Sequence, residues 1–437
     1  MFKIYASNEK SAYEVNELAK MFLPQDQFEL EIDGKDLSKN SQKQNAYKAL
    51  AEFTGRELDW GILTGVRPSK LFNQLVRDNG FETASRLMKD EYYLSERKVK
   101  LLQDIYTVQK GVVSDEDRYA CGVYIGIPFC PSRCLYCSFT SNVISKDKAT
   151  AYMAALEKEI SETKRIMDRE GLYAESVYIG GGTPSSLDDE DFEKLLLLTK
   201  KYFINSKTSE WTVEAGRPDT ITLSKLKLIE KYGANRISIN PQTMKDDTLK
   251  TIGRHHSARQ IIEAYNMARE FPFIVNMDLI CGLPNETAED FENTLTSILK
   301  MNPDNITVHT LAVKKASKLI EIEPEFAFKQ AKVVEDMLGI ASELLSKEYK
   351  PYYMYRQKHM AGNFENVGYC KNNTASLYNI RIMEENQSII ALGAGGISKV
   401  YYPAENRLER VANVSNYEIY IDRIDEMIQR KDNGIVL

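Results

Sequence analysis

The chain has no apolar run of the roughly 20 residues that a membrane-spanning helix needs. It also has no excess of basic residues, since its 57 Lys and Arg are outnumbered by 63 Asp and Glu. General nucleic-acid binders usually carry a basic stripe, so neither a membrane nor a nucleic-acid partner is expected. The first residues lack the basic and apolar regions of a signal peptide. The cytoplasm is therefore the expected compartment.

Histidine and cysteine are both scarce, at 4 and 6 of 437 residues. The histidines show no metal-ligand spacing, and we assign them no catalytic role. Three of the cysteines are crowded into "CPSRCLYC" (130–137). Cytoplasmic thiols stay reduced, so this crowding indicates metal binding or catalysis rather than disulfides. The cysteines expected in or near the core are Cys121, Cys281 and Cys370, and the four histidines are His255, His256, His309 and His359.

The pattern of strands and helices changes at about residue 115. Residues 1–115 are expected to form a small α+β N-terminal domain. In residues 116–320 strand-like runs alternate with helices, which predicts parallel strands joined by helices. Residues 321–437, with a helix near 415–430, are expected to form a C-terminal α+β extension that covers the substrate. The six strand-like runs are 121–127, 176–180, 210–215, 235–240, 273–280 and 305–310.

Six strand–helix units are too few for a closed eight-stranded barrel. The expected fold is therefore α/β, a partial (three-quarter) βα barrel, and an open doubly wound sheet is the alternative. In both architectures, ligands bind at the C-terminal ends of the parallel strands.

The cysteines in 130–137 have C-x3-C-x2-C spacing and follow directly on the first of these strands. A structural zinc site normally needs four protein ligands, and no paired Cys or His lies nearby. Inert core thiols are a second alternative, but they explain poorly why three lie within eight residues. We favour a 4Fe-4S cluster bound through three irons, with the fourth iron open to a small molecule.

The segment "YIGIPFCPSRCLYCSF" (124–139) resembles the radical S-adenosylmethionine (SAM) superfamily. Specifically, it is similar to the oxygen-independent coproporphyrinogen III dehydrogenases and their relatives of the HemN, HemW and HemZ types. The resemblance implies that SAM chelates the open iron of a 4Fe-4S cluster. One electron then cleaves a C–S bond and releases a 5′-deoxyadenosyl radical. The resemblance also implies metal-binding and catalytic roles for Cys130, Cys134 and Cys137, and a catalytic role for Tyr124.

The same resemblance implies a set of SAM-binding residues on successive strand ends. Glycines after the second strand let a ligand approach the backbone closely, and in the family this segment holds the methionine amino group. One or two SAM molecules are compatible with the set. The residues implied to bind SAM are Tyr124, Tyr136, Gly181, Gly182, Thr183, Glu214, Gln242, Arg254, Asp278, Ala312 and Ile397.

Three further segments, 60–71, 352–370 and 392–399, resemble the HemZ branch. The implied reaction is oxidative decarboxylation of coproporphyrinogen III propionates to vinyl groups, which gives protoporphyrinogen IX in heme biosynthesis. Flavodoxin or ferredoxin is the implied electron donor. Two departures are Gly126, where His is common, and Phe139, where well-studied dehydrogenases carry an extra Cys.

Two alternatives share the SAM motifs. The first is a heme-binding chaperone of the same family, but its heme-binding His is replaced here by Glu365 and the Trp of its motif by Cys370. A carboxylate is a poor axial ligand for heme. The second is a radical SAM methyltransferase that acts on heme, which the sequence separates less well.

A substrate with four carboxylates requires cations. For each candidate an ordinary solvated charge is the more frequent explanation, because basic residues are mostly on the surface. The candidates near strand ends or in the N-terminal domain are Arg67, Lys70, Arg217, Lys314, Lys315, Arg356 and Lys358.

Overall fold

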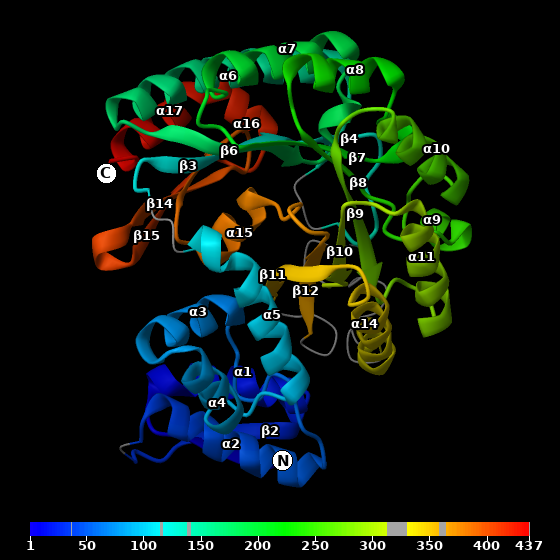
Figure 1. The fold of residues 1–437 in the computed structure, drawn as a ribbon. Helices are drawn as coiled ribbons and strands as arrows, with labels where there is room; N and C mark the ends of the chain where they lie inside the picture. The colour runs from blue at the N-terminus through cyan, green and yellow to red at the C-terminus, as the bar shows by residue number, and fades with distance from the viewer. Residues whose placement is uncertain (36, 114–116, 138–140, 313–329, 358–363, 437) are drawn as a thin grey trace.

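The structure is a computed structural model that describes the chain except residues 36, 114–116, 138–140, 313–329, 358–363 and 437. Its main body is a curved sheet with the strand order β11-β12-β10-β9-β8-β7-β6-β3-β13-β14-β15. Figure 1 shows helices covering the outer face of this sheet and a smaller unit below it. None of the described helices is both long enough and apolar enough to cross a membrane.

The centre of the sheet consists of parallel strands. From β3 to β10 the strands lie side by side in chain order, as in a barrel. In a doubly wound sheet the strand order would reverse partway across the sheet. The observed order confirms the predicted partial βα barrel. The parallel strands are β3 (Ala120–Ile127), β6 (Tyr173–Gly181), β7 (Glu210–Gly216), β8 (Arg236–Ile239), β9 (Ile274–Cys281), β10 (Asn305–Thr310) and β13 (Ser388–Leu392).

Amphipathic helices cover the outer face because each buries one apolar side against the strands. The helix α8, for example, buries Leu226 and Ile229 and is capped by Gly233, whose φ of 91° is left-handed. The outer helices are α6 (Lys146–Arg169), α7 (Asp189–Tyr202), α8 (Leu223–Tyr232), α9 (Asp246–Thr251), α10 (Ala258–Arg269), α11 (Ala288–Met301) and α14 (Ala331–Leu345).

The C-terminal region extends the sheet at both edges. β12 (Glu365–Cys370) pairs antiparallel with β10, and β11 (Lys350–Arg356) pairs with β12. At the other edge β13 pairs with β3 and is followed by the hairpin of β14 (Ile397–Tyr402) and β15 (Arg407–Ala412). The single helix expected near 415–430 is in fact two, because Arg423 leaves helical geometry between them. They are α16 (Tyr417–Asp422) and α17 (Ile424–Gly434).

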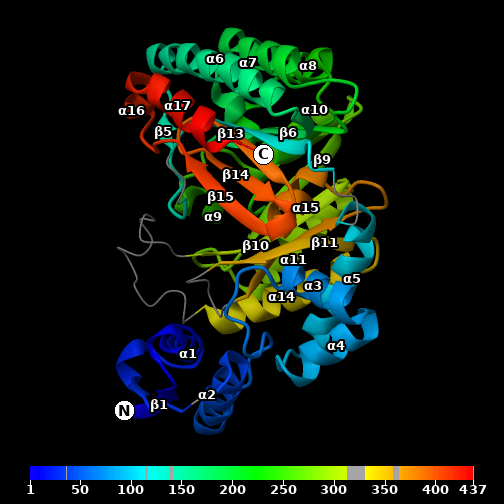
Figure 2. The same cartoon turned by 90° about the vertical axis from the view of Figure 1, so that its left-hand side faces the viewer.

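The N-terminal part has two groups of buried side chains. Residues 4–62 form a core of their own, whereas α3, α4 and α5 share the main core. The buried side chains therefore divide near residue 62, inside the range 1–115, and Figure 2 shows α1 and α2 set apart below the barrel. The elements are β1 (Phe2–Ala6), α1 (Glu9–Phe22), β2 (Phe28–Ile32), α2 (Lys39–Thr54), α3 (Pro68–Asn79), α4 (Phe81–Asp90) and α5 (Glu96–Val113).

The helix α15 (Leu377–Glu384) lies on the inner side of the curved sheet and contacts β3, β6, β11 and α5. Its N-terminus is held by Glu210 at the start of β7. The Glu210 carboxylate accepts hydrogen bonds from the backbone N–H groups of Leu377 and Tyr378 at 2.8 and 3.1 Å. A carboxylate suits this place because a helix N-terminus carries partial positive charge. The helix therefore occupies the inside of the barrel at the N-terminal ends of the strands.

Candidate active site

A cavity of about 520 Å³ opens at the C-terminal ends of the parallel strands and continues inward to α15. It is lined by every residue that the sequence places at the SAM site except Ile397. Ile397 begins β14, the second strand from the edge of the sheet, and is 48% exposed, and it does not line this cavity. The predicted residues that line the cavity are Tyr124, Cys130, Cys134, Tyr136, Cys137, Gly181, Gly182, Thr183, Glu214, Gln242, Arg254, Asp278 and Ala312.

The loop that carries the three cysteines is fixed to the barrel on two sides. Cys130 ends β4 (Phe129–Cys130), a two-residue strand that pairs with β5 (Asn142–Val143). Further along, the Ser132 hydroxyl donates to the Gly253 carbonyl oxygen at 3.0 Å. The loop therefore presents all three thiols to one cavity. Among the described residues no three Cys, His, Asp or Glu side chains already converge as a complete metal-ligand set.

The glycine segment after β6 packs directly against this loop. The backbone N–H of Gly182 donates to Ile127 and that of Thr183 to Phe129, both at 2.7 Å. A Cβ at position 182 would lie 2.4 Å from the Phe129 carbonyl oxygen and 2.9 Å from the Cys130 sulfur. The backbone can approach the cluster loop this closely only because residue 182 is glycine.

The donor set fits a small polar ligand held against the cysteine loop. Three buried polar atoms in the cavity wall have no hydrogen-bond partner within the described chain: Asn240 Oδ1, Gln242 Oε1 and Arg254 Nε. Gln242 also adopts a φ of 68°, which is uncommon for a residue other than glycine and is often found at binding sites. Groups of this kind are suited to bind a polar ligand or water.

Arg254 keeps its positive charge close to the cysteine loop. Its guanidinium donates to the Asn240 carbonyl oxygen. Burial by itself would lower the pKa of Arg254, but Tyr136 and Cys134 beside the guanidinium raise it above its usual range. A planar guanidinium in this position suits a carboxylate, whose two oxygens it can bind together.

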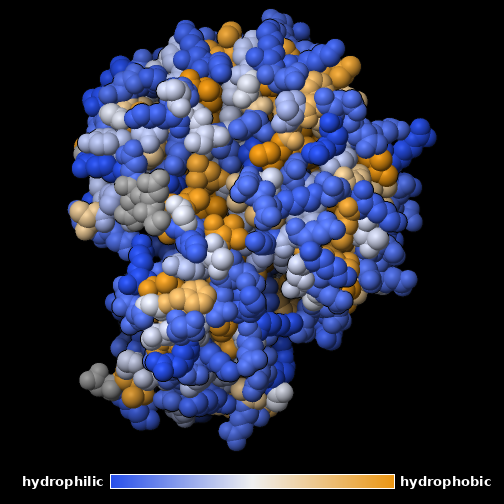
Figure 3. Space-filling model, viewed as in Figure 1, coloured by the Kyte–Doolittle hydropathy of each residue, from blue (hydrophilic) through white to orange (hydrophobic). Residues whose placement is uncertain are grey.

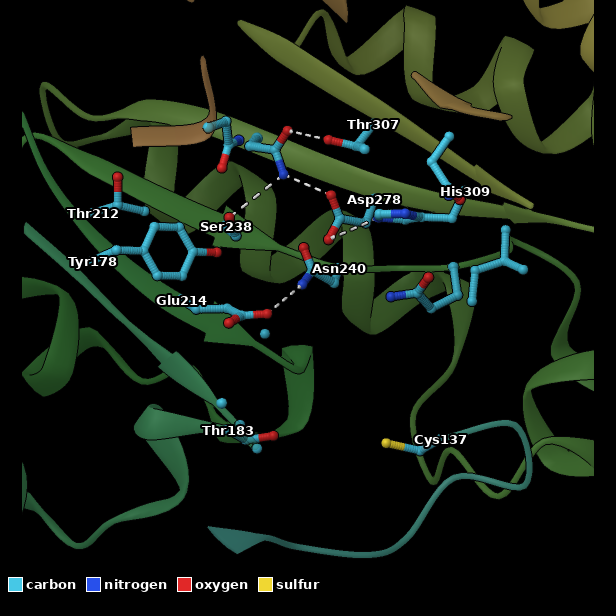
Figure 4. Close-up of a pocket in the computed structure, with 18 of the residues that line it drawn as sticks. Cys137, Tyr178, Thr183, Thr212, Glu214, Ser238, Asn240, Asp278, Thr307 and His309 are labelled. Carbon is cyan, nitrogen blue, oxygen red and sulfur yellow. Dashed lines mark hydrogen bonds and ion pairs between the residues drawn. The ribbon is translucent and has the colours of Figure 1, made fainter. Parts of the chain in front are cut away.

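Two carboxyl groups face the cavity from neighbouring parts of the barrel, and their pKa values are shifted in opposite directions. Burial, and then the charge of Asp278, raises the pKa of Glu214 to about 8. Burial would also raise the pKa of Asp278, but hydrogen bonding to His309 and the charge of that histidine lower it. Figure 4 shows both side chains projecting into the space that Thr183 and Cys137 border from the other side.

His309 is the residue at this site that the sequence analysis missed. It lines the cavity, with Nε2 at 3.7 Å from Asp278 Oδ2 and Nδ1 at 3.3 Å from the hydroxyl of Tyr355. On the other side of Asp278, the amide of Asn276 donates to Oδ1 at 2.8 Å. The only signal in the sequence was a single histidine within β10, which carries no ligand spacing.

Two of the cations proposed as substrate ligands have hydrogen-bond partners within the protein, and one of them, Arg217, also lines the cavity. Arg217 is 3% exposed, and its guanidinium donates to both carboxylate oxygens of Asp219 at 3.0 and 2.8 Å and to the Ser132 hydroxyl at 2.7 Å. It therefore fixes the cysteine loop. Arg356 is 4% exposed and donates to the Leu63 carbonyl oxygen at 2.7 Å, and burial lowers its pKa to about 10.

Cys121, Cys281 and Cys370 are buried free thiols, as predicted. Arg67 and Lys70 lie at the start of α3. The residues that fall outside the described part of the chain are Phe139, Lys314, Lys315, Lys358 and His359.

Residues 124–298 match the model of the radical SAM superfamily. The chain is 37% identical over 390 residues to the oxygen-independent coproporphyrinogen-III oxidase-like protein HemZ of Bacillus subtilis, which covers 87% of this chain and 78% of that protein. The chain belongs to this family of radical SAM proteins. The family implies a 4Fe-4S cluster and SAM as cofactors.

A second family member is also similar along most of the chain. The heme chaperone HemW of Bacillus subtilis is 30% identical over 305 residues, covering 69% of this chain and 76% of that protein. Among solved structures, coproporphyrinogen III oxidase (HemN) from Escherichia coli aligns with a TM-score of 0.55 at 22% identity, covering 73% of this chain and 72% of that one. This last likeness concerns the fold alone. Family membership thus includes both oxidases and chaperones.

Proposed function

We propose that this protein catalyses the oxygen-independent oxidative decarboxylation of coproporphyrinogen III propionates to vinyl groups, giving protoporphyrinogen IX. A hydrogen atom leaves the β-carbon of a propionate, the bond to the carboxylate carbon breaks with loss of carbon dioxide, and one electron passes to an acceptor. Two rounds convert two propionates. The observation that carries the proposal is that the three cysteines and nearly all of the proposed SAM contacts line one cavity. The similarity to HemZ supports this choice of reaction.

The cluster and SAM, when bound, supply the one-electron chemistry that removes the hydrogen atom. We propose that Cys130, Cys134 and Cys137 hold the cluster. The glycine segment and Arg254 bind the amino-acid end of SAM, and Asp278 binds the adenosine hydroxyls. Whether one or two SAM molecules bind can be decided by equilibrium dialysis of the reconstituted protein.

Glu365 supports an enzyme rather than a heme chaperone. It stands where the chaperones carry their heme-binding histidine, and here it is buried, at 3% exposure. Its carboxylate accepts a hydrogen bond from the Trp60 indole N–H at 2.8 Å and another from the Lys98 ammonium. Glu365 also does not line the cavity among the described residues. Glu365 therefore links β12 to the N-terminal part of the chain.

The direct test is anaerobic. Protein reconstituted with iron and sulfide should give a cluster whose paramagnetic spectrum changes when SAM is added. Incubation with SAM, coproporphyrinogen III, reduced flavodoxin or ferredoxin and an electron acceptor should then yield one carbon dioxide for each vinyl group formed.

The matched pair of variants for this test is Cys134→Ala and Cys370→Ala. Both remove one thiol, but only Cys134 lies on the cluster loop, whereas Cys370 is a buried thiol in β12. Cys134→Ala should abolish product, and Cys370→Ala should retain it. Stoichiometric heme binding without any turnover of coproporphyrinogen III would reject the proposed reaction.

A further inference from the structure

A cluster of four cations surrounds one carboxylate beside α15, outside the cavity lining described above. The carboxylate is Glu385, which directly follows α15. It forms an ion pair with Arg67 and lies 3.6 Å from Lys70, 3.3 Å from Lys399 and 3.9 Å from Arg410. Within the described residues, Glu385 is the carboxylate that these four side chains share. The cluster therefore gathers four positive charges around one carboxylate, and the carboxyl group of Glu384 also lies near Lys70.

These cations come from parts of the chain that are far apart in sequence. Arg67 is the N-cap of α3 and Lys70 lies in its first turn, where no side chain caps the helix. Lys399 and Arg410 come from the β14–β15 hairpin, where they are direct cross-strand partners. Like charges opposite one another on neighbouring strands are unfavourable, and an uncapped helix N-terminus adds further positive potential. The fold thus brings these cations close together despite their mutual repulsion.

The cation side chains are partly shielded from water. The side chain of Lys399 is 15% exposed and that of Arg67 is 21% exposed, whereas Arg410 at the rim is 62% exposed. Burial, and then the charge of Arg67, lowers the pKa of Lys399. A partly desolvated cation gains more from an anionic ligand than a fully solvated one. The arrangement therefore favours binding of an anion at this place.

The cluster follows the C-terminal end of α15, the helix that lines the inner part of the cavity. Ile382 and Met383 line the cavity, and Glu385 follows two residues later. Exposed apolar side chains accompany the cations, since Val66 precedes Arg67 and Ile397 lies two residues before Lys399 on the same face of β14. Figure 3 shows apolar side chains gathered in the hollow where α15 lies in Figure 1. An apolar hollow with cations at its edge fits an amphipathic ligand.

We propose that Arg67, Lys70, Lys399 and Arg410 bind a propionate carboxylate of the tetrapyrrole while another propionate of the same molecule reacts in the cavity. This inference rests on the proposed function and names the residues that hold the substrate. Binding energy from a remote, non-reacting group orients the reacting one. The four cations would thus determine which side chain of the tetrapyrrole reaches the cysteine loop.

The test measures binding of coproporphyrin III, the stable oxidised form of the substrate, to the full-length reconstituted protein by fluorescence titration. Lys399→Gln and Arg410→Gln should each weaken binding about fivefold, a typical loss for one partly exposed charge pair. Glu385→Gln should strengthen binding roughly threefold, because it removes the carboxylate that competes for the same cations. Porphyrin without carboxylates should bind equally to all variants. The control is Lys194→Gln, a cation of 39% exposure paired with Glu157 on the outer helices, which should change nothing.

If the cluster binds the ligand, Glu385→Gln and Lys399→Gln should change coproporphyrin affinity in opposite directions. This distinguishes ligand binding from a structural role. Weaker binding in Glu385→Gln as well as in Lys399→Gln would mean that the cluster only maintains the fold, and would overturn the proposal. Unchanged coproporphyrin affinity together with weaker flavodoxin binding would assign the cluster to the electron donor instead. In both cases vinyl products from the unmodified protein would leave the proposed reaction standing. Arg410→Gln keeps the test valid if a more buried variant does not fold. If the unmodified protein neither binds coproporphyrin III nor forms vinyl products, both proposals fail.

Discussion

Replacing Glu214 by glutamine should raise the stability of the protein at pH 8 and leave it nearly unchanged near pH 4.5. Burial and the nearby charge of Asp278 raise the pKa of Glu214 from its ordinary value of 4.5 to about 8. Between these two values the unfolded chain releases the proton of this carboxyl group and the folded chain retains it. The free energy of unfolding therefore falls as the pH rises through this range. Glutamine has nearly the same shape and does not titrate, so it removes this dependence.

The size of the effect follows from the width of the pH window. A shift from 4.5 to about 8 corresponds to at most about 5 kcal/mol, at about 1.4 kcal/mol per pH unit. The Glu214 side chain is partly exposed to the cavity, and solvent reduces such effects. We therefore expect the variant to gain about 1–2 kcal/mol at pH 8 relative to pH 5, which is about 1–2 °C in Tm for a chain of this length.

The assay is thermal unfolding, followed by circular dichroism at intervals from pH 5 to pH 8.5, on reconstituted protein without SAM. Glu292→Gln is the matched control, because this glutamate is exposed on α11 and its replacement should give the same Tm difference at every pH. A Glu214→Gln variant whose Tm runs parallel to that of the unmodified protein across the range would refute the reasoning. So would a variant that loses stability as the pH rises.

Three other substitutions probe the site and its supports. His309→Ala should weaken SAM binding about tenfold in calorimetry. It should not affect binding of an analogue that lacks the ribose hydroxyls, because the histidine acts through Asp278. Equal losses for both ligands would contradict this. Lys98→Met should lower the free energy of unfolding in urea by about 3–5 kcal/mol, since it leaves the buried Glu365 carboxylate without its ammonium partner, and Glu365→Gln in the same chain should recover part of the loss. Gly181→Ala should abolish SAM binding while the far-ultraviolet spectrum is kept, because the residue has a φ of 110° and a Cβ there would lie 2.8 Å from a carbonyl oxygen of β3; retained binding would show that the segment can shift.

The sequence predicted much of the barrel because each parallel strand is a short apolar run followed by polar residues. Since the C-terminal ends of parallel strands meet at one edge, residues such as Thr183, Glu214 and Asp278 could be expected to face one another without knowledge of any distance. The structure places all three around one cavity. Strand periodicity and strand order were therefore sufficient for the residues on the central strands.

The sequence was less informative for residues whose position depends on which edge of the sheet their strand joins. It was also less informative for residues whose position depends on a hydrogen-bond or ion-pair partner. Ile397 belongs to a hairpin whose place beside β13 is a matter of tertiary packing. Arg217 was expected either in solvent or on the substrate, but the Asp219 carboxylate two residues later holds it inside the protein. His309 becomes part of the site only through the register of β10 against β9, which sets it beside Asp278. The positions of Ile397 and His309 cannot be read from local sequence.

The opposite pKa shifts of Glu214 and Asp278 indicate how one cavity can hold two carboxyl groups close together. Ionising two neighbouring carboxyl groups costs free energy where solvent exposure is low. The surrounding groups therefore determine which of the two keeps its charge. His309 favours the ionised form of Asp278, because its ring faces the Asp278 carboxylate, whereas Glu214 is hydrogen-bonded by the neutral amide of Asn240 at 3.3 Å and by the backbone of Gly181. A neutral Glu214 can donate a hydrogen bond to a ligand, and an ionised Asp278 can only accept one. The cavity therefore offers a donor and an acceptor on one wall, and removal of the His309 ring should make the two groups more alike.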